Sequence, residues 1–331
     1  MTDFPQDDFR PTASLDSLRQ RASLLARLRH FFSQRDFLEV ETPILSADTV
    51  VDRHLDPLSV TLFDDPQTPD VGQRMWLQTS PEFVMKRLLA SGADRIYQVT
   101  RAFRGGAESG EHHNPEFTMV EWYRVGDSME AGMALLGELA CEILNSDRAS
   151  RISYGEAFRR YVDVDPHVAT VRELSIAAKS HGVAIPGDMP EIDRDEWLNL
   201  LLATLVEPNL GLERPEILYD YPASQAALAQ VRDDKPPVAE RFELYVRGIE
   251  LANGYHELLD AEVLRERNRQ NNLLRQTDGK IKLPEDSRLL AAMEHGLPDC
   301  VGVALGFDRL VMIAAGASSL REVMAFPIDR A

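Results

Sequence analysis

The sequence predicts an α+β fold in which an antiparallel sheet is flanked by helices. Two strand patterns, at residues 239–246 and 249–257, are separated by Arg247 and Gly248, which is typical of a β-hairpin. Segments with helical periodicity surround this hairpin, and strands and helices do not alternate regularly as they do in a doubly wound fold. With 331 residues, of which 44% are hydrophobic, the chain can bury a sizeable core.

The N-terminal part of the chain contains several segments with clear local patterns. Residues 14–34 are expected to form an amphipathic helix, followed by an extended segment. The core-facing residues of this helix are expected to be Leu18, Leu25, Leu28 and Phe32. The acidic stretch 64–72 predicts a loop and residues 80–90 predict a helix. Residues 96–103 predict a strand that leads into a glycine-containing loop at 104–111.

The remainder of the chain adds further helices to this pattern. Residues 130–144 and 172–181 have helical periodicity. A proline-containing linker at 186–195 precedes another expected helix at 197–206. Residues 262–276 are also expected to be helical.

Residues 113–123 (HNPEFTMVEWY) are the most informative segment of the chain. On an extended strand Phe117, Met119, Glu121 and Tyr123 would share one face. Burying an ionised Glu121 beside aromatic rings costs free energy unless a cation or strong donors meet it, so a positively charged ligand group would explain it. The alternative is an amphipathic strand whose glutamate is exposed to solvent.

The hairpin at 239–257 places carboxylates close together. A two-residue turn would pair Tyr245 with Glu250 and make Glu243 a diagonal neighbour of Glu250 on the same face. Converging carboxylates need a cation, and hard oxygen ligands suit Mg²⁺ with phosphate oxygens as its other ligands. The alternative is a carboxylate pair at a hydrated sheet edge.

The second strand of this hairpin carries three more polar residues on one face, namely Asn253, Tyr255 and Glu257. Strict alternation puts that face opposite the face of Glu250. All four side chains would serve one pocket only if a bulge lies between Glu250 and Asn253, and Gly254 is compatible with such an irregularity.

Residues 300–312 predict a short apolar strand that turns at Gly306 and enters a helix capped by Asp308. Arg309 would then lie in the first helical turn, beside backbone donors and the positive end of the helix dipole. This arrangement suits a phosphate chain. The alternative is that Arg309 pairs with a surface carboxylate.

These three segments, in this order, resemble the motifs of class II aminoacyl-tRNA synthetases, and the strings HNPEFTMVEWY and ELANGYHEL are similar to those of the lysine branch. The resemblance extends over residues 18–327. Residues 37–45 resemble the first motif of the family, which forms a dimer interface and therefore implies a homodimer. The resemblance also implies ATP and Mg²⁺ as cofactors.

The expected absence of an anticodon-binding β-barrel narrows the resemblance further, because only a polar leader, residues 1–13, precedes an expected single domain at 14–331. The chain is similar to truncated members of the family that attach lysine or β-lysine to a lysine side chain of translation elongation factor P. The resemblance implies a two-step reaction through an acyl-adenylate. A minimal lysyl-tRNA synthetase and a non-catalytic, nucleotide-binding regulatory paralogue remain as alternatives.

The resemblance also implies roles for individual residues. Arg104 would hold the α-phosphate and the substrate carboxylate, Arg309 would hold the γ-phosphate, and both would act in catalysis. The ATP contacts would be Arg104, Glu108, His113, Asn114, Phe117, Glu243, Glu250 and Arg309, with Mg²⁺ on Glu243 and Glu250. The amino-acid substrate would contact Ser80, Glu82, Glu121, Tyr123, Asn253, Tyr255, Glu257 and Ala304.

Two positions depart from the family pattern. The family places a glutamate soon after the arginine of its second motif, whereas Arg104 is followed by a longer loop. Glu108 is the candidate for this adenine-contacting acid, and Glu111 is its competitor. Ala304 stands where lysyl-tRNA synthetases usually have glycine, and this position bears on the choice between lysine and β-lysine.

Composition favours a protein substrate over RNA. The chain has 54 acidic against 36 basic residues and a net charge of -18, so its surface as a whole should repel a polyphosphate, although a local basic patch remains possible. We therefore do not expect tRNA as a partner. The chain has two cysteines, an acidic N-terminus and no apolar run of membrane-spanning length, so we expect a cytoplasmic protein without a disulfide framework. His112 and His113 alone make a poor zinc site.

Overall fold

The computed structural model describes residues 9–106, 110–187, 189 and 192–331. It divides into two compact units. The first comprises Met1–Val125, Leu259–Pro298 and Ala304–Ala331, and the second comprises Gly126–Leu258 and Asp299–Val303. Strand β12 (Cys300–Gly306) contributes residues to both units. The expected single domain at 14–331 stays a prediction.

Helix α1 (Leu15–Ser33) opens the first unit and confirms the helix expected at 14–34. It begins where it does because the side chain of Ser14 accepts a hydrogen bond from the amide of Ser17 and so caps the helix. The expected core positions are only half right. Leu28 and Phe32 are buried, whereas Leu18 and Leu25 are half-buried and the neighbouring face contributes the buried residues Leu24 and Phe31.

The first unit contains strands that pair in both parallel and antiparallel directions. Strand β5 (Arg95–Phe103) pairs in parallel with β1 (Leu38–Glu39) and antiparallel with β6 (Glu116–Val125). The ring of Phe32 stacks on Tyr97 of β5 with 4.4 Å between the ring centroids, which fixes α1 against the sheet. The expected strand at 96–103 is thus confirmed.

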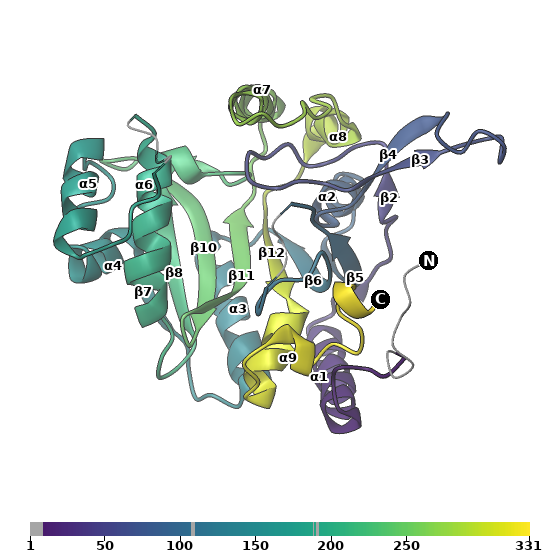
Figure 1. Cartoon of the computed structure of the whole chain (residues 1–331), viewed down its shortest axis with the longest axis horizontal. Helices are drawn as coiled ribbons and strands as arrows, with labels where there is room; N and C mark the ends of the chain where they lie inside the picture. The colour runs from purple at the N-terminus through teal and green to yellow at the C-terminus, as the bar shows by residue number, and fades with distance from the viewer. Residues whose placement is uncertain (1–8, 107–109, 188, 190–191) are drawn as a thin grey trace. The chain divides into compact units, whose positions relative to one another are not determined.

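A second, three-stranded antiparallel sheet in the first unit has the order β2 (Leu45–Ser46), β4 (Gln73–Leu77), β3 (Ser59–Leu62). Strands β3 and β4 form a hairpin that extends away from the rest of this unit (Figure 1). The expected loop at 64–72 is confirmed as the connection of this hairpin, although the strands themselves were not expected.

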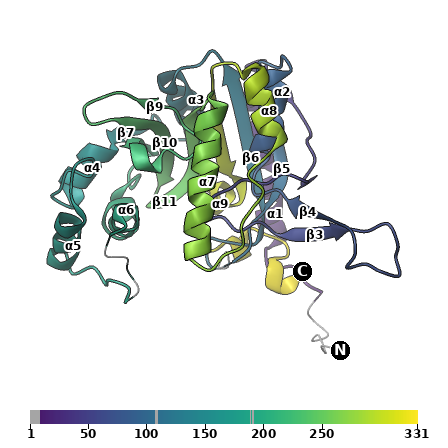
Figure 2. The same ribbon diagram turned by 90° about the horizontal axis from the view of Figure 1, so that it is seen from above.

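Four helices complete the first unit, namely α2 (Glu82–Ala90), α7 (Ala261–Thr277), α8 (Arg288–Gly296) and α9 (Phe307–Ala315). Helix α8 contacts both α2 and α7, and Figure 2 shows α7 and α8 side by side. Two short 3-10 helices, Leu320–Glu322 and Ile328–Arg330, lie near the end of the chain. The helices expected at 80–90 and 262–276 are confirmed as α2 and α7, whereas α8 was not expected.

The two ends of the described chain meet in the first unit. The amide of Thr12 donates to the carbonyl oxygen of Ala325 at 2.9 Å, and its hydroxyl donates to that of Met324 at 2.9 Å. The described part of the expected leader is therefore attached to the C-terminal segment, and residues 1–8 lie outside the description. No helix in the described part of the chain combines the length and the apolar character that crossing a membrane requires.

The strands of the second unit also pair in both parallel and antiparallel directions. Strand β10 (Val238–Val246) pairs antiparallel with β8 (Glu216–Pro222), β11 (Ile249–His256) and the short β9 (Val231–Arg232). Strand β8 also pairs in parallel with β7 (Ser150–Ser153). The expected hairpin is therefore confirmed as β10 and β11.

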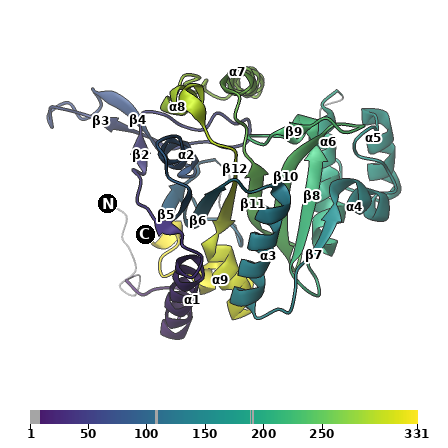
Figure 3. The same ribbon diagram turned by 180° about the vertical axis from the view of Figure 1, so that it is seen from behind.

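Helices cover both faces of this sheet. Helix α3 (Met129–Leu144) lies on one face, whereas α4 (Tyr154–Tyr161), α5 (Val171–Ser180) and α6 (Arg194–Leu201) lie on the other (Figure 3). The core beneath α4, α5 and α6 includes the buried residues Tyr154, Phe158, Leu174, Trp197, Leu198, Tyr221 and Tyr245. The single-turn helices Glu207–Asn209 and Ala223–Gln225 complete the unit.

Two of the three helices expected in this unit are confirmed with nearly their expected bounds, as α3 and α5. The third helix, expected at 197–206, begins earlier, at Arg194. The side chain of Asp193 accepts a hydrogen bond from the amide of Glu196 and so caps α6. It ends as a π-helical turn at Leu202–Val206. Both units combine mixed sheets with flanking helices, so the α+β class is confirmed.

Candidate active site

Glu121 on β6 is a buried carboxylate among aromatic residues. Only 2% of its surface is exposed, and its Oε1 accepts a hydrogen bond of 2.6 Å from the hydroxyl of Tyr123. The two residues share a face because they are two positions apart on one strand. The alternative of a solvent-exposed glutamate is therefore wrong at this position.

Arg104 follows directly after β5. Its amide donates to the carbonyl oxygen of Pro115 at 2.9 Å, and its guanidinium carbon lies 5.0 Å from the ring centroid of Phe117. Its Nε is buried and has no hydrogen-bond partner among the described residues. A buried donor without an acceptor costs free energy, so this nitrogen fits a ligand oxygen.

Arg309 lies in the first turn of α9, as expected. Its Nε donates to the carbonyl oxygen of His112 at 3.1 Å, and a terminal nitrogen lies 2.6 Å from Nε2 of His113. The structure therefore brings together the two residues that were predicted to contact the triphosphate.

Asp308 does not cap α9. The capping position belongs to Gly306, without a side-chain hydrogen bond, and Asp308 lies inside the first turn. Its carboxylate instead accepts from the amide of Thr118 at 2.6 Å and pairs with Arg21 at 2.6 Å. The predicted cap was wrong because this buried carboxylate binds α1 and β6.

Two substrate candidates lie at the start of α2. Ser80 is buried and accepts at 3.3 Å from the amide of Glu82. The carboxylate of Glu82 is bound at 2.6 Å by the ammonium of Lys86, which is itself buried. Lys86 was not singled out from the sequence, although its spacing of four residues from Glu82 on an expected helix was a usable signal.

The side-chain amide of Asn114 forms hydrogen bonds with the backbone of two other residues. Its Nδ2 donates to the carbonyl oxygen of Glu116 at 2.5 Å, and its Oδ1 accepts from the amide of Ile328 at 2.9 Å. Its role in ATP binding stays a prediction. Glu108 lies outside the described residues, and its competitor Glu111 is exposed.

The β10–β11 hairpin has the predicted turn and the predicted bulge. Arg247 and Gly248 both have positive φ, 53° and 75°, as a two-residue hairpin turn of this type requires. Tyr245 pairs with Glu250, but two residues earlier on β10 Glu243 pairs with Asn253.

The strand therefore holds one extra residue between Glu250 and Ala252, and that residue is Leu251. The bulge puts Glu250 and Asn253 on the same face as Glu243, since directly paired residues share a face. Gly254 is needed for another reason, because a Cβ there would lie 2.4 Å from the ring of Phe242.

Glu243 is held by three donors. It accepts from the hydroxyls of Tyr221 at 2.5 Å and Tyr245 at 2.6 Å, and from a guanidinium nitrogen of Arg241 at 2.5 Å. Only 4% of its surface is exposed, so the alternative of a hydrated edge is wrong for Glu243.

The same cluster shifts the pKa of its members. Burial, together with the charge of Glu243, raises the pKa of Tyr221 and of Tyr245 well above the usual value. Burial lowers the pKa of Arg241, but the charge of Glu243 outweighs it, so that pKa is raised. Arg241 was missed from the sequence, although its spacing of two residues from Glu243 placed it on the same strand face.

The other polar residues of β11 lie near one another. Nδ2 of Asn253 donates to the hydroxyl of Tyr255 at 3.1 Å. Glu257 is 1% exposed and follows the end of the strand, where its amide donates to the carbonyl oxygen of Cys300 at 3.0 Å.

His256 was also missed. Its Nδ1 lies 2.5 Å from Glu240 and its Nε2 lies 2.8 Å from Asp299. Burial lowers its pKa, but the hydrogen bond and charge of Glu240 and the charge of Asp299 outweigh burial and raise it. The residue that follows a predicted substrate contact, Tyr255, is thus a histidine held between two carboxylates.

The predicted site residues fall in both units. Arg104, His113, Glu121 and Arg309 belong to the first unit, and the hairpin residues belong to the second. The prediction that all of them line one cavity therefore stays a prediction. Across residues 9–106, 110–187, 189 and 192–331, no three His, Cys, Asp or Glu side chains are grouped so that they could hold a metal ion.

Comparison with known proteins identifies the family. Residues 7–330 match the model of the class II tRNA synthetases (D, K and N). Proteins named elongation factor P--(R)-beta-lysine ligase are similar to this chain over 323 residues and 98% of both sequences, with 49% identity in Edwardsiella ictaluri and 47% in Yersinia enterocolitica serotype O:8 and Salmonella paratyphi B. The chain therefore belongs to the class II tRNA synthetase family.

Proposed function

We propose that the protein activates lysine or (R)-β-lysine with ATP and transfers it to a lysine side chain of translation elongation factor P. The names of the full-length relatives support this acceptor and this amino acid. The observation that carries the proposal is buried Glu121, bound by Tyr123, on the strand of the family's second motif. A buried carboxylate of this kind matches the ammonium group of a lysine-like substrate.

The residues of the first unit fit a nucleotide. The buried Nε of Arg104 lacks a described acceptor, and the guanidinium lies against Phe117, which would stack on adenine. Arg309 and His113 are already in contact at 2.6 Å and would share the terminal phosphates. Arg104 would neutralise the charge that builds up on the α-phosphate as the substrate carboxylate attacks it.

The two glutamates of the hairpin fit Mg²⁺ in part. Oε2 of Glu243 already accepts from two tyrosine hydroxyls, which uses both of its lone pairs, whereas Oε1 accepts only from Arg241 among the described residues and has one lone pair left for a metal. Glu250 is on the same sheet face and would supply the second carboxylate. When bound, Mg²⁺ would supply charge neutralisation for the triphosphate.

Three carboxylates would select the two amino groups of the substrate. Glu121 and Glu257 are buried, and burial strengthens their attraction for an ammonium group. Glu82 is paired with Lys86 at 2.6 Å, so it would share its carboxylate with the substrate amine. The methyl group of Ala304 would contribute to the choice between lysine and β-lysine by steric fit.

The reaction needs no nucleophile from the enzyme. The substrate carboxylate forms a bond to the α-phosphorus as pyrophosphate leaves, which gives the acyl-adenylate. The ε-amine of the acceptor lysine then attacks the carbonyl carbon, an amide bond forms and AMP leaves, while the amine loses a proton. Neither Cys141 nor Cys300 is assigned a role in these steps.

The test is to incubate the protein with ATP, Mg²⁺ and labelled lysine or (R)-β-lysine, together with elongation factor P or with tRNA. We expect label on elongation factor P. Label on tRNA alone would instead support a minimal lysyl-tRNA synthetase. An absence of ATP–pyrophosphate exchange with every lysine isomer would support a non-catalytic regulatory role.

The matched variants are E121Q and E116Q. Both change a glutamate on β6, but the side chain of Glu116 is half exposed and pairs with Arg101 only at 3.5 Å. We expect E121Q to raise the KM for the amino acid in pyrophosphate exchange and E116Q to keep the wild-type value. Light scattering of the purified protein would test the proposed homodimer.

A further inference from the structure

Arg275 near the C-terminal end of α7 is a buried cation that is hydrogen-bonded to surrounding loop residues. It is 1% exposed. Its guanidinium donates to the carbonyl oxygens of Ile281 at 3.1 Å, Asp52 at 2.8 Å and Leu55 at 2.9 Å, and to Oδ1 of Asp56 at 2.9 Å. This set of bonds satisfies a buried charge that would otherwise destabilise the fold.

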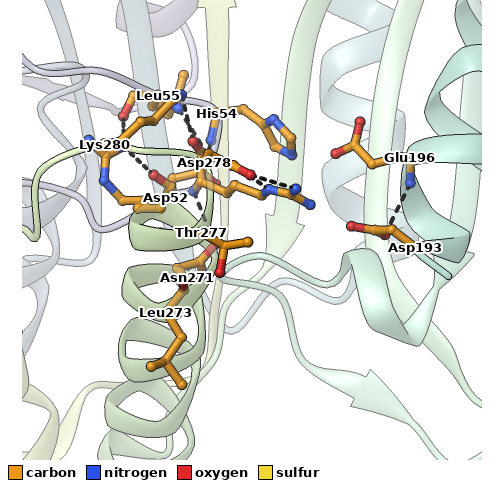
Figure 4. Close-up of polar contacts among 12 residues, drawn as sticks. Asp52, His54, Leu55, Asp193, Glu196, Asn271, Leu273, Thr277, Asp278 and Lys280 are labelled. Atoms are coloured by element: carbon orange, nitrogen blue, oxygen red, sulfur yellow. Dashed lines mark hydrogen bonds and ion pairs between the residues drawn. The ribbon is translucent and has the colours of Figure 1, made fainter. Parts of the chain in front are cut away.

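Asp56 is held from a second side by Lys280, whose ammonium lies 2.9 Å from Oδ2. Burial raises the pKa of Asp56, but the hydrogen bonds from Lys280 and Arg275 outweigh burial and lower it. Lys280 also donates to the carbonyl oxygen of Arg53 at 2.9 Å. Figure 4 shows Lys280 and the loop residues Asp52 and Leu55 gathered at this end of α7.

The two residues after Arg104 lie in close contact with Asp56. The amide of Gly105 donates to the carbonyl oxygen of Asp56 at 2.6 Å. A Cβ on Gly105 would lie 3.0 Å from Cδ2 of Leu58 and 3.2 Å from that carbonyl oxygen, and a Cβ on Gly106 would lie 3.4 Å from Oδ2 of Asp56. Gly106 also has a φ of +77°, so this close approach depends on glycine.

We propose that Asp56, fixed by Arg275 and Lys280, is a positioning residue for Arg104 and hence for the nucleoside triphosphate that Arg104 holds. The inference rests on the proposed function and adds to it a group that does not touch the substrate. The backbone of Arg104 is fixed on one side by Pro115, and the hydrogen bond between Gly105 and Asp56 fixes it on the other. A displacement of Asp56 moves the guanidinium relative to the α-phosphate.

The chain offers a matched control for this inference. Asp278 forms an ion pair of 2.7 Å with Arg53 at the same end of α7, and its side chain is 28% exposed against 31% for Asp56. Both carboxylate oxygens of Asp278 accept from Arg53, and within the described part of the chain neither is hydrogen-bonded to residues 104–106. D56N and D278N therefore remove comparable charges, and only D56N disturbs the support of Arg104.

The experiment measures ATP affinity by calorimetry, and the KM for ATP and kcat by ATP–pyrophosphate exchange, in the full-length wild type, D56N, D56E and D278N. We expect D56N to weaken ATP affinity by about tenfold, since a misplacement of about an ångström costs up to about 100-fold. We expect the KM for the amino acid to rise as well, since Arg104 would also hold the substrate carboxylate, and D56E to recover part of the affinity. D278N should bind ATP as the wild type does.

Equal ATP affinity in D56N and wild type would overturn the inference, and so would equal losses in D56N and D278N. Should D56N fail to fold, the ATP affinity of G105A would test the inference instead. Its methyl group separates the loop from Asp56 without removing a charge. Wild-type affinity in G105A would then overturn the inference. A wild-type protein that binds no ATP would contradict the proposed function itself, which distinguishes the two failures.

Discussion

The ion pair between Glu82 and Lys86 allows a quantitative test of the substrate-binding end of the site. K86M removes the cation and keeps most of the apolar stem. At 2.6 Å two unit charges attract by about 6 kcal/mol at an effective dielectric constant of about 20. Part of this attraction offsets the desolvation of both groups, so breaking a buried pair from one side destabilises a protein by about 3–5 kcal/mol.

We therefore expect K86M to lower the free energy of unfolding by about 3 kcal/mol or more, measured by urea denaturation. The double variant E82Q/K86M should recover much of this loss, because no buried carboxylate is then left without its cation. Added lysine should raise the unfolding midpoint of K86M more than that of the wild type, since the substrate amine would replace the missing ammonium.

A K86M protein within about 1 kcal/mol of the wild type would refute this reasoning, because that is the contribution of an exposed pair. An equal effect of lysine on both proteins would refute the placement of a substrate amine at Glu82. R87M is the control, because Arg87 is the neighbouring cation on α2 and is only partly buried; we expect it to cost less than about 1 kcal/mol.

Three further predictions follow from other parts of the site. E121Q should raise the KM for lysine in pyrophosphate exchange by about tenfold or more, because it removes a buried charge that pairs with the substrate amine; an unchanged KM would contradict this role. The raised pKa of His256 implies that its two carboxylate contacts stabilise the fold fully below the ordinary pKa of 6.5 and less as pH rises through the higher folded pKa. H256Q should therefore flatten the fall in unfolding midpoint above that pH in a pH-dependent melting series, and a parallel fall in both proteins would count against it. G254A should destabilise the protein by about 1–3 kcal/mol in urea, since its methyl group would overlap a phenylalanine ring at 2.4 Å, whereas G110A has open space around it and should cost little.

Local patterns predicted much of the fold. The hairpin turn at Arg247 and Gly248 was predictable because only residues that tolerate positive φ fit it, and α1 was predictable from its serine cap and apolar periodicity. The strands β3, β7 and β8 were not, because they are short or lack alternation and owe their state to pairing with distant strands.

The sequence predicted which residues belong to the site better than it predicted which residues they contact. The buried state of Glu121 and the bulge before Asn253 followed from alternation along one strand. Asp308 was assigned to a helix cap because caps are local, whereas its partner Arg21 is 287 positions away in the sequence and leaves no local signal. The support of Arg104 by Asp56 could not be predicted for the same reason. It depends on contacts between a loop, the end of a helix and a glycine that are far apart in the sequence.

The extra residue in β11 makes the irregular pairing of the strands, and not only residue type, a requirement of this hairpin. Regular pairing of the same residues, without the bulge at Leu251, would leave every polar side chain present and yet send Glu250 to the opposite side of the sheet from Asn253. A related chain that separates the two residues by two positions would bring them to one face in a regular strand, so their spacing has to be judged together with the presence of the bulge when related chains are compared.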